Sequence, residues 1–138
     1  MRKLGIDYGK VRTGIAITDE LGLTSQGLKT IKHDGNDKML LKELDLIMKE
    51  YKIDTIVVGM PVNMDGNEGP RVEETNAFIH KLKCKYNKIK IETVDERLTT
   101  VQAYNTMNEL GVDKKKKKAI VDTLSATYIL EVYINKSH

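Results

Sequence analysis

The chain has 138 residues, of which 40% are hydrophobic and 31% charged, so it has the length and composition of one folded domain over residues 1–138 and not of a disordered chain. Its formal net charge of +3 comes from one run of five lysines, Lys114 to Lys118; the rest is slightly acidic, which excludes a globally basic, histone-like nucleic-acid binder. The single cysteine excludes an intramolecular disulfide. The charged amino-terminal residues predict that there is no signal peptide, and the lack of an apolar stretch of about 20 residues predicts no membrane partner. Together these features predict a cytoplasmic protein.

The first third of the chain has the pattern of three strands joined by turns. Leu4 to Asp7 and Gly14 to Thr18 form two strands around a turn that ends at Arg12, and Leu28 to Ile31 can close an antiparallel meander. A capping side chain at Asn36 or its neighbour then predicts the start of a helix. Apolar residues at helical spacing give this helix a buried face, namely Leu40, Leu44, Ile47 and Tyr51.

The second half alternates strands with helices. Thr55 to Gly59 has the apolar, β-branched pattern of a strand buried on both faces of a parallel sheet. A helix begins at Pro70, where the missing N–H costs nothing, and Ile89 to Thr93 alternates as an edge strand. Two further helices are predicted over Thr100 to Leu110 and Asp113 to Tyr133. We therefore expect an α/β fold with one mixed five-stranded sheet, an antiparallel meander plus two parallel strands, and helices on both faces.

Three acidic residues are predicted to meet at one edge of this sheet. Asp7 ends the first strand and Asp95-Glu96 end the last, and open α/β sheets hold ligands at the carboxyl ends of their parallel strands. Asp122 lies on an otherwise apolar helix face, where an unpaired carboxylate would be costly. Converging carboxylates repel one another, and Mg²⁺ prefers such oxygen ligands. Two such ions about 4 Å apart can activate water and stabilise the leaving oxygen of a phosphodiester.

Each acid also has a purely structural interpretation. Asp7 can form an Asx turn, and Asp95 can cap the helix that follows. Glu96 can pair with a neighbouring base, and Asp122 with Lys118 four residues earlier. On spacing alone, the metal site and the structural interpretation are about equally supported.

Four segments of the sequence, residues 5–16, 58–71, 95–100 and 116–130, resemble the YqgF family of RuvC-like nucleases in order and spacing. The resemblance covers essentially the whole chain. It implies an RNase H-like fold and a cytoplasmic bacterial nuclease that matures the precursor of small-subunit ribosomal RNA, with members also described as resolvase-like. By position, it implies that the acidic site residues are Asp7, Glu96 and Asp122.

Side chains near the same edge are candidates for contact with nucleic acid. A guanidinium binds two phosphate oxygens at once, which favours Arg71 and Arg97, although Arg97 could instead orient Glu96. A loop with two glycines can bring an asparagine and backbone N–H groups close to phosphate, although a plain surface loop explains it equally well. A run of like charges opposes the dipole of the helix it starts, which favours a negatively charged partner. The candidates are Arg12, Asn63, Arg71, Arg97, Lys117 and Lys118.

The leading hypothesis is a metal-dependent nuclease that acts on structured nucleic acid, with RNA preferred and branched DNA possible. Asp7, Glu96 and Asp122 would hold Mg²⁺ or Mn²⁺. The alternatives are an endonuclease of Holliday junctions, a non-catalytic nucleic-acid or ribosome-binding module, and a phosphotransferase, because Asp7-Tyr8-Gly9 followed by Gly14 resembles the phosphate hairpin of sugar kinases. Ribosomal precursor particles are a candidate partner. Monomer and homodimer both stay open, and cutting two strands of a junction symmetrically would need two paired sites.

Overall fold

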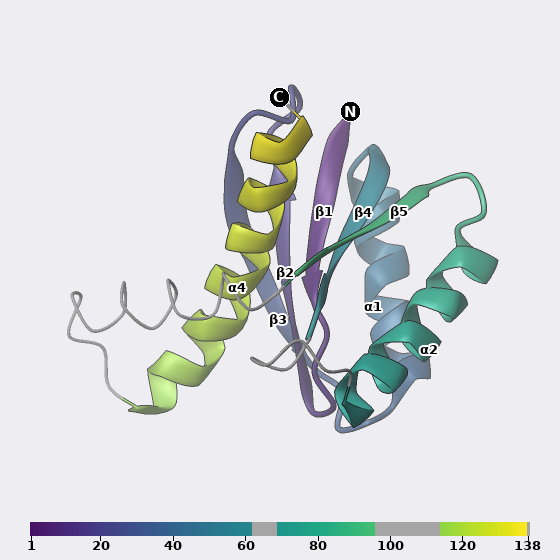
Figure 1. The fold of residues 1–138 in the computed structure, drawn as a ribbon, viewed down its shortest axis with the longest axis vertical. Coiled ribbons are helices and arrows are strands. Elements are labelled where there is room, and N and C mark those ends of the chain that lie inside the picture. The colour runs from purple at the N-terminus through teal and green to yellow at the C-terminus, as the bar shows by residue number, and fades with distance from the viewer. Residues whose placement is uncertain (62–68, 96–113, 138) are drawn as a thin grey trace.

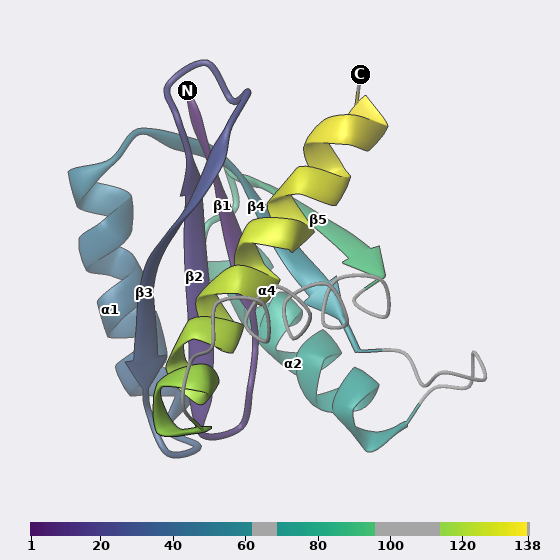
Figure 2. The same cartoon turned by 90° about the vertical axis from the view of Figure 1, so that its left-hand side faces the viewer.

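The structure is a computed structural model that describes residues 1–61, 69–95 and 114–137, and the side chains of residues 114–122 and 137 lie outside the description. Its strands form one five-stranded sheet, with α1 (Asp37–Glu50) and α2 (Pro70–Lys85) on one face and α4 (Lys114–Ser137) on the other (Figure 1; Figure 2). This arrangement confirms the predicted mixed α/β sheet with helices on both faces.

The strands form an antiparallel meander with two parallel additions. The meander consists of β1 (Arg2–Asp7), β2 (Arg12–Thr18) and β3 (Ser25–Lys32). β4 (Ile53–Met60) and β5 (Lys90–Asp95) lie parallel to β1, so the order across the sheet is β3-β2-β1-β4-β5. The prediction that the first turn extends through Arg12 is wrong, because the backbone of this residue already pairs with Lys32 of β3.

The helices begin where the sequence predicts. The side chain of Asn36 accepts a hydrogen bond from the amide three residues later at 3.2 Å and so caps α1, and α2 begins at Pro70. α4 continues to Ser137, beyond the predicted end at Tyr133. The predicted helix over residues 100–110 lies outside the described part of the chain. None of the described helices has the length and apolarity needed to cross a membrane.

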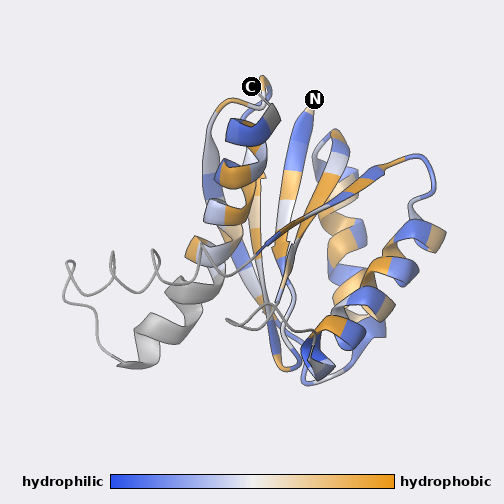
Figure 3. Cartoon of the chain, viewed as in Figure 1, coloured by the Kyte–Doolittle hydropathy of each residue, from blue (hydrophilic) through white to orange (hydrophobic). Residues whose placement is uncertain are grey.

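A hydrophobic cluster lies on each face of the sheet. The cluster under α1 and α2 includes Leu4, Ile6, Ile15, Ile17, Leu40, Leu44, Ile56, Val58, Phe78 and Leu82. The cluster under α4 consists of Ala16, Val57, Val94, Ala126, Ile129 and Leu130. Because β4 contributes to both clusters, the prediction of a strand buried on both faces is confirmed. Figure 3 shows the hydrophobic residues gathered along the central strands, with hydrophilic residues interspersed on α1 and α2.

α4 crosses its face of the sheet diagonally (Figure 2). It approaches β1 most closely at Gly5, where a Cβ atom would lie 2.6 Å from Cγ of Leu130 and 2.8 Å from the carbonyl oxygen of Ala126. Further along the helix, the ring centre of Tyr133 lies 6.0 Å from Nζ of Lys3, near the start of β1. α4 therefore runs opposite to β1, and its first half points toward the carboxyl end of β1.

Candidate active site

The carboxyl ends of the three parallel strands lie at one edge of the sheet (Figure 2). Asp7 is the last residue of β1, and Asp95 is the last residue of β5. β4 lies between these strands, with Val58 paired to Ile6 and Met60 paired to Asp95. Both aspartates are partly buried. The expected shared edge is therefore present at Asp7 and Asp95, and the next residue in the sequence, Glu96, lies outside the described residues.

α4 brings the position of Asp122 toward the same edge. The backbone of residue 122 lies one helical turn before Ala126, which is about 5.4 Å along the helix axis and on the side away from Tyr133. Because Ala126 packs over Gly5 in the middle of β1, this direction leads toward the end of β1 that carries Asp7.

Two of the predicted phosphate contacts lie at this edge as well. Arg71 is exposed in the first turn of α2, and its Nη2 donates a hydrogen bond to the carbonyl oxygen of Tyr8 at 3.3 Å. Arg12 is partly buried at the start of β2, which lies beside the end of β1 because the two strands are antiparallel. The amino end of α2 adds its positive dipole here. The edge thus combines a carboxylate with two guanidinium groups, an arrangement suited to phosphate.

Tyr8, directly after Asp7, packs into the protein on the α1 and α2 side. Its ring stacks on Phe78 at a centroid distance of 4.3 Å and on His33 at 6.1 Å. Its hydroxyl donates to Oδ1 of Asp37 at 2.8 Å, and Nζ of Lys81 lies 2.9 Å from Oδ2 of the same carboxylate. Burial and the hydrogen bond to Asp37 raise the pKa of Tyr8 well above its ordinary value. The ring is therefore a neutral packing element and is not free to stack on a base.

Comparison with known proteins identifies the family. Residues 1–136 match the family model described as "RuvX: Holliday junction resolvase". The chain belongs to this family. The suspected membership of the YqgF family is thereby confirmed.

Relatives of the RuvX family match this chain over nearly its whole length. A protein of Ruminiclostridium cellulolyticum is 49% identical over 136 residues, which cover 99% of this chain and 95% of that protein. A protein of Acetivibrio thermocellus is 47% identical over 135 residues, covering 98% and 96%. Both are named "Putative pre-16S rRNA nuclease".

Solved structures confirm the fold expected for the RuvX family. Thermus thermophilus RuvC in complex with a Holliday junction matches with a TM-score of 0.57 at 12% identity, over 99% of this chain and 96% of that one. The Fowlpox virus resolvase with Holliday junction DNA matches with a TM-score of 0.61 at 13% identity, over 99% of both chains. At these identities the likeness shows the fold alone. That fold is RNase H-like, as the sequence resemblance implied.

Most of the other RuvX site residues predicted from the sequence lie beyond the described side chains. Glu96, Asn63 and Arg97 fall in ranges that the structure does not describe, and Asp122, Lys117 and Lys118 are described only as part of the α4 backbone. Within the described ranges, no group of three His, Cys, Asp or Glu side chains is placed to hold a metal ion. A carboxylate at the open end of a sheet suits a hard cation that keeps water ligands. Mg²⁺ or Mn²⁺ therefore stays a prediction.

The sequence interpretation missed the residues that hold Tyr8. His33 is 2% exposed, and its Nε2 lies 2.9 Å from the hydroxyl of Thr13. Asp37 contacts Tyr8 across 29 residues of the chain, and Lys81 contacts Asp37 across 44. No local sequence pattern indicates such contacts. The sequence shows only that Asp37 is an acidic residue at the start of a predicted helix.

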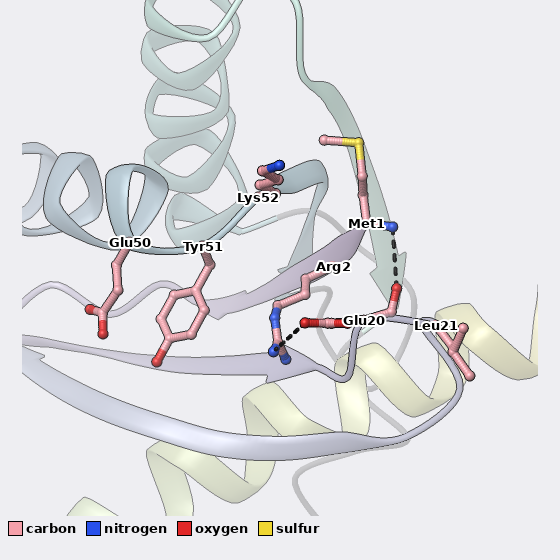
Figure 4. Close-up of a pocket in the computed structure, with 7 residues that line it drawn as sticks. All are labelled: Met1, Arg2, Glu20, Leu21, Glu50, Tyr51 and Lys52. Atoms are coloured by element: carbon pink, nitrogen blue, oxygen red, sulfur yellow. Dashed lines mark hydrogen bonds and ion pairs between the residues drawn. The ribbon is translucent and has the colours of Figure 1, made fainter.

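The described surface has two hollows, one at the opposite end of the sheet from Asp7 and one on the α1 side of the end that carries Asp7. One, of about 730 Å³, opens at the amino ends of the strands, where Arg2 pairs with Glu20 at 3.8 Å (Figure 4). The other, of about 490 Å³, lies beside the start of α1 and includes Asp37 and Lys81. Both combine acidic with basic groups, so neither has a uniform charge that would favour a polyanion.

Proposed function

We propose that this member of the RuvX family is a metal-dependent nuclease that hydrolyses phosphodiester bonds in the precursor of small-subunit ribosomal RNA. The observation that carries the proposal is the meeting of Asp7, Arg71 and the amino end of α2 at the carboxyl edge of an RNase H-like sheet. The names of the relatives at 47% and 49% identity support the RNA substrate. Cytoplasmic location and binding to ribosomal precursor particles follow from that substrate and stay predictions.

The chain's own groups would bind and orient the scissile phosphate. Asp7, Glu96 and Asp122 would hold Mg²⁺ or Mn²⁺, which when bound supplies activation of water and neutralisation of the leaving oxygen. Arg71 stands at the same edge with its guanidinium exposed, so it can bind the phosphate oxygens while still contacting the backbone of Tyr8. The backbone dipoles at the start of α2 favour the same negative charge.

The test is cleavage of a structured ribosomal RNA precursor in the presence of Mg²⁺. Asp7→Asn keeps the size of the side chain but weakens its interaction with a cation. We expect the cleavage rate to fall by more than about a hundredfold, since even outer partners of metal ligands are worth about 10- to 100-fold. Asp54→Asn is the matched control, because Asp54 lies near the opposite end of the sheet at the start of β4. Equal rates for wild type and Asp7→Asn would contradict the proposal, as would a wild type that cleaves no RNA.

A second candidate is an endonuclease that resolves branched DNA. The family description and the likeness to two resolvases with bound Holliday junctions favour it. Because such an enzyme must cut two strands symmetrically, it needs two paired active sites. Cleavage of a four-way junction, together with a dimer in sedimentation experiments under the same conditions, would support this candidate. A strict monomer that cleaves only RNA would exclude it.

A further inference from the structure

Three links fix the residue that follows Asp7. The ring of Tyr8 lies between Phe78 and His33, its hydroxyl is bound to Asp37, and its carbonyl oxygen is bound to Arg71. The chain then turns tightly, since a Cβ on Gly9 would lie 2.2 Å from a carbonyl oxygen across the turn. The backbone on the carboxyl side of Asp7 is therefore tied to α1 by the side chain of Tyr8, which packs on the α1 and α2 side of the sheet, and to α2 by Arg71.

We propose that the triad of Tyr8, Asp37 and Lys81 is a positioning device that fixes the carboxyl end of β1 and thereby the carboxylate of Asp7. The phenol belongs to the residue directly after β1, the carboxylate to α1 and the ammonium group to α2, so their two bonds of 2.8 Å and 2.9 Å join the end of β1 to both helices. None of the three touches the scissile phosphate. They act through the backbone of Tyr8, and their role in catalysis rests on the function proposed above.

The protein contains a second triad with the same chemistry further along α1 and α2. The hydroxyl of Tyr86 donates to Oδ1 of Asp45 at 2.5 Å, and Nζ of Lys85 lies 2.8 Å from Oδ2 of the same carboxylate. Asp45 lies eight residues after Asp37 on α1, and Lys85 lies four residues after Lys81 on α2. This second triad joins the interior of α1 to the carboxyl end of α2 and touches no residue of the carboxyl edge of the sheet, so it supplies a matched control.

The effect of a neighbouring hydrogen bond that orients a metal ligand has a typical size. Partners that orient metal ligands are worth about 10- to 100-fold in metal affinity or activity. Tyr8 acts through the backbone and not on the carboxylate itself, which places the expected effect near the lower limit, at about tenfold. The same loss of order should let the amides at the end of β1 exchange their hydrogens faster, because local opening requires less free energy.

The experiment compares Tyr8→Phe with Tyr86→Phe in the full chain. Each change removes one phenol-to-carboxylate hydrogen bond and keeps the ring. Three quantities are measured for each variant: the urea midpoint, the amide hydrogen exchange of residues 6–8 without metal, and the dissociation constant for Mn²⁺ by calorimetry. We expect similar shifts of the midpoint in both variants. Only Tyr8→Phe should raise the exchange rates and the Mn²⁺ dissociation constant, each by about tenfold. Lys81→Met and Lys85→Met provide a second pair with the same expected contrast.

The outcomes separate this inference from the function on which it rests. Unchanged exchange at residues 6–8 in Tyr8→Phe, or an equal change in Tyr86→Phe, overturns the positioning role. The role is also overturned if Mn²⁺ binds through Asp7, as shown by its loss in Asp7→Asn, and Tyr8→Phe leaves the affinity unchanged. If wild type binds no Mn²⁺, the proposed metal site fails, and the hydrogen exchange alone decides whether the triad holds the end of β1.

Discussion

At the scale of single residues, buried phenol groups are held in one protonation state by their partners. Tyr86 is partly buried and donates its hydroxyl proton to Asp45. Burial and the negative charge of Asp45 both oppose ionisation, and they raise the pKa of Tyr86 well above its ordinary value. Burial also disfavours the charged form of Asp45, but hydrogen bonds from Lys85 and Tyr86 outweigh it and lower the pKa of Asp45. The pair is therefore a neutral phenol on an ionised carboxylate.

The raised pKa of Tyr86 predicts a loss of stability in alkali. Because the unfolded phenol ionises near about pH 10 and the folded one does not, its contribution is complete below about pH 10 and falls as the pH rises toward the folded pKa. The difference in unfolding free energy between wild type and Tyr86→Phe should therefore stay constant up to about pH 9.5 and narrow between about pH 9.5 and about pH 11.5. Urea unfolding of both proteins at several pH values measures this difference. A difference that stays constant over this range would contradict the assignment.

At the scale of elements, the position of α4 depends on a residue without a side chain. Gly5 faces α4 from the middle of β1, between Leu4 and Ile6, which face the opposite cluster. The backbone of α4 at Ala126 occupies the space that a Cβ on residue 5 would need. Since the carbonyl oxygen belongs to a helix, it cannot move aside alone, and the whole of α4 would have to shift.

Gly5→Ala should therefore destabilise the protein by about 1–3 kcal/mol, the usual cost of overpacking a core. The control is Gly27→Ala on β3, where the new Cβ would lie 3.1 Å from the side chain of Thr123 and meet no backbone of α4. The nearest atom there is Cβ of Thr123, so α4 would have to give way by only a few tenths of an ångström, and we expect a smaller loss of stability. Urea unfolding of both variants checks this order. Equal losses of stability in the two variants would contradict the inference that the close approach of α4 at Gly5 determines the cost of a Cβ atom there.

Much of the fold could be predicted from the sequence because its signals are local. The apolar run at residues 55–59, the cap at Asn36 and the proline at the start of α2 each mark an element by themselves. The strand β3 begins at Ser25, earlier than the predicted Leu28. The sequence did not indicate this start because the edge strand is largely exposed and its extent depends on pairing with β2. Asp7 was predicted from topology, whereas the contacts of Tyr8 with Asp37 depend on packing between elements distant in the chain.

At the scale of the whole molecule, the excess of positive charge belongs to the start of α4. Residues 114–118 are all lysines and form the first residues described in this helix, whose first turn contains no acidic residue. Like charges at the amino end of a helix oppose its dipole. A negatively charged partner would remove this conflict, and the helix runs onward past Asp122 over the sheet that carries Asp7.

Neutralising part of this run should weaken the salt dependence of nucleic-acid binding. Each lysine that contacts a phosphate adds about 0.7 to 0.9 to the slope of log K against log salt. Lys117→Gln combined with Lys118→Gln should therefore lower the slope by about 1.4 to 1.8. The control pair is Lys49→Gln with Lys52→Gln, which removes the same charge from exposed positions near the amino ends of the strands. Filter binding at several salt concentrations measures the slope. Equal reductions would show that only net charge matters.

The order of the elements along the chain has a consequence for synthesis. All five strands precede α4, which alone among the described helices covers its face of the sheet. On the ribosome, the strands and the two helices of the other face emerge first, while Ala16, Val57 and Val94 stay exposed to water. The same helix contains Asp122. The set of residues proposed to form the nuclease site is therefore complete only after α4 has covered this face of the sheet. A nascent chain halted before Lys114 would therefore expose this hydrophobic surface, which suits binding by a chaperone, and would lack one residue of the proposed nuclease site.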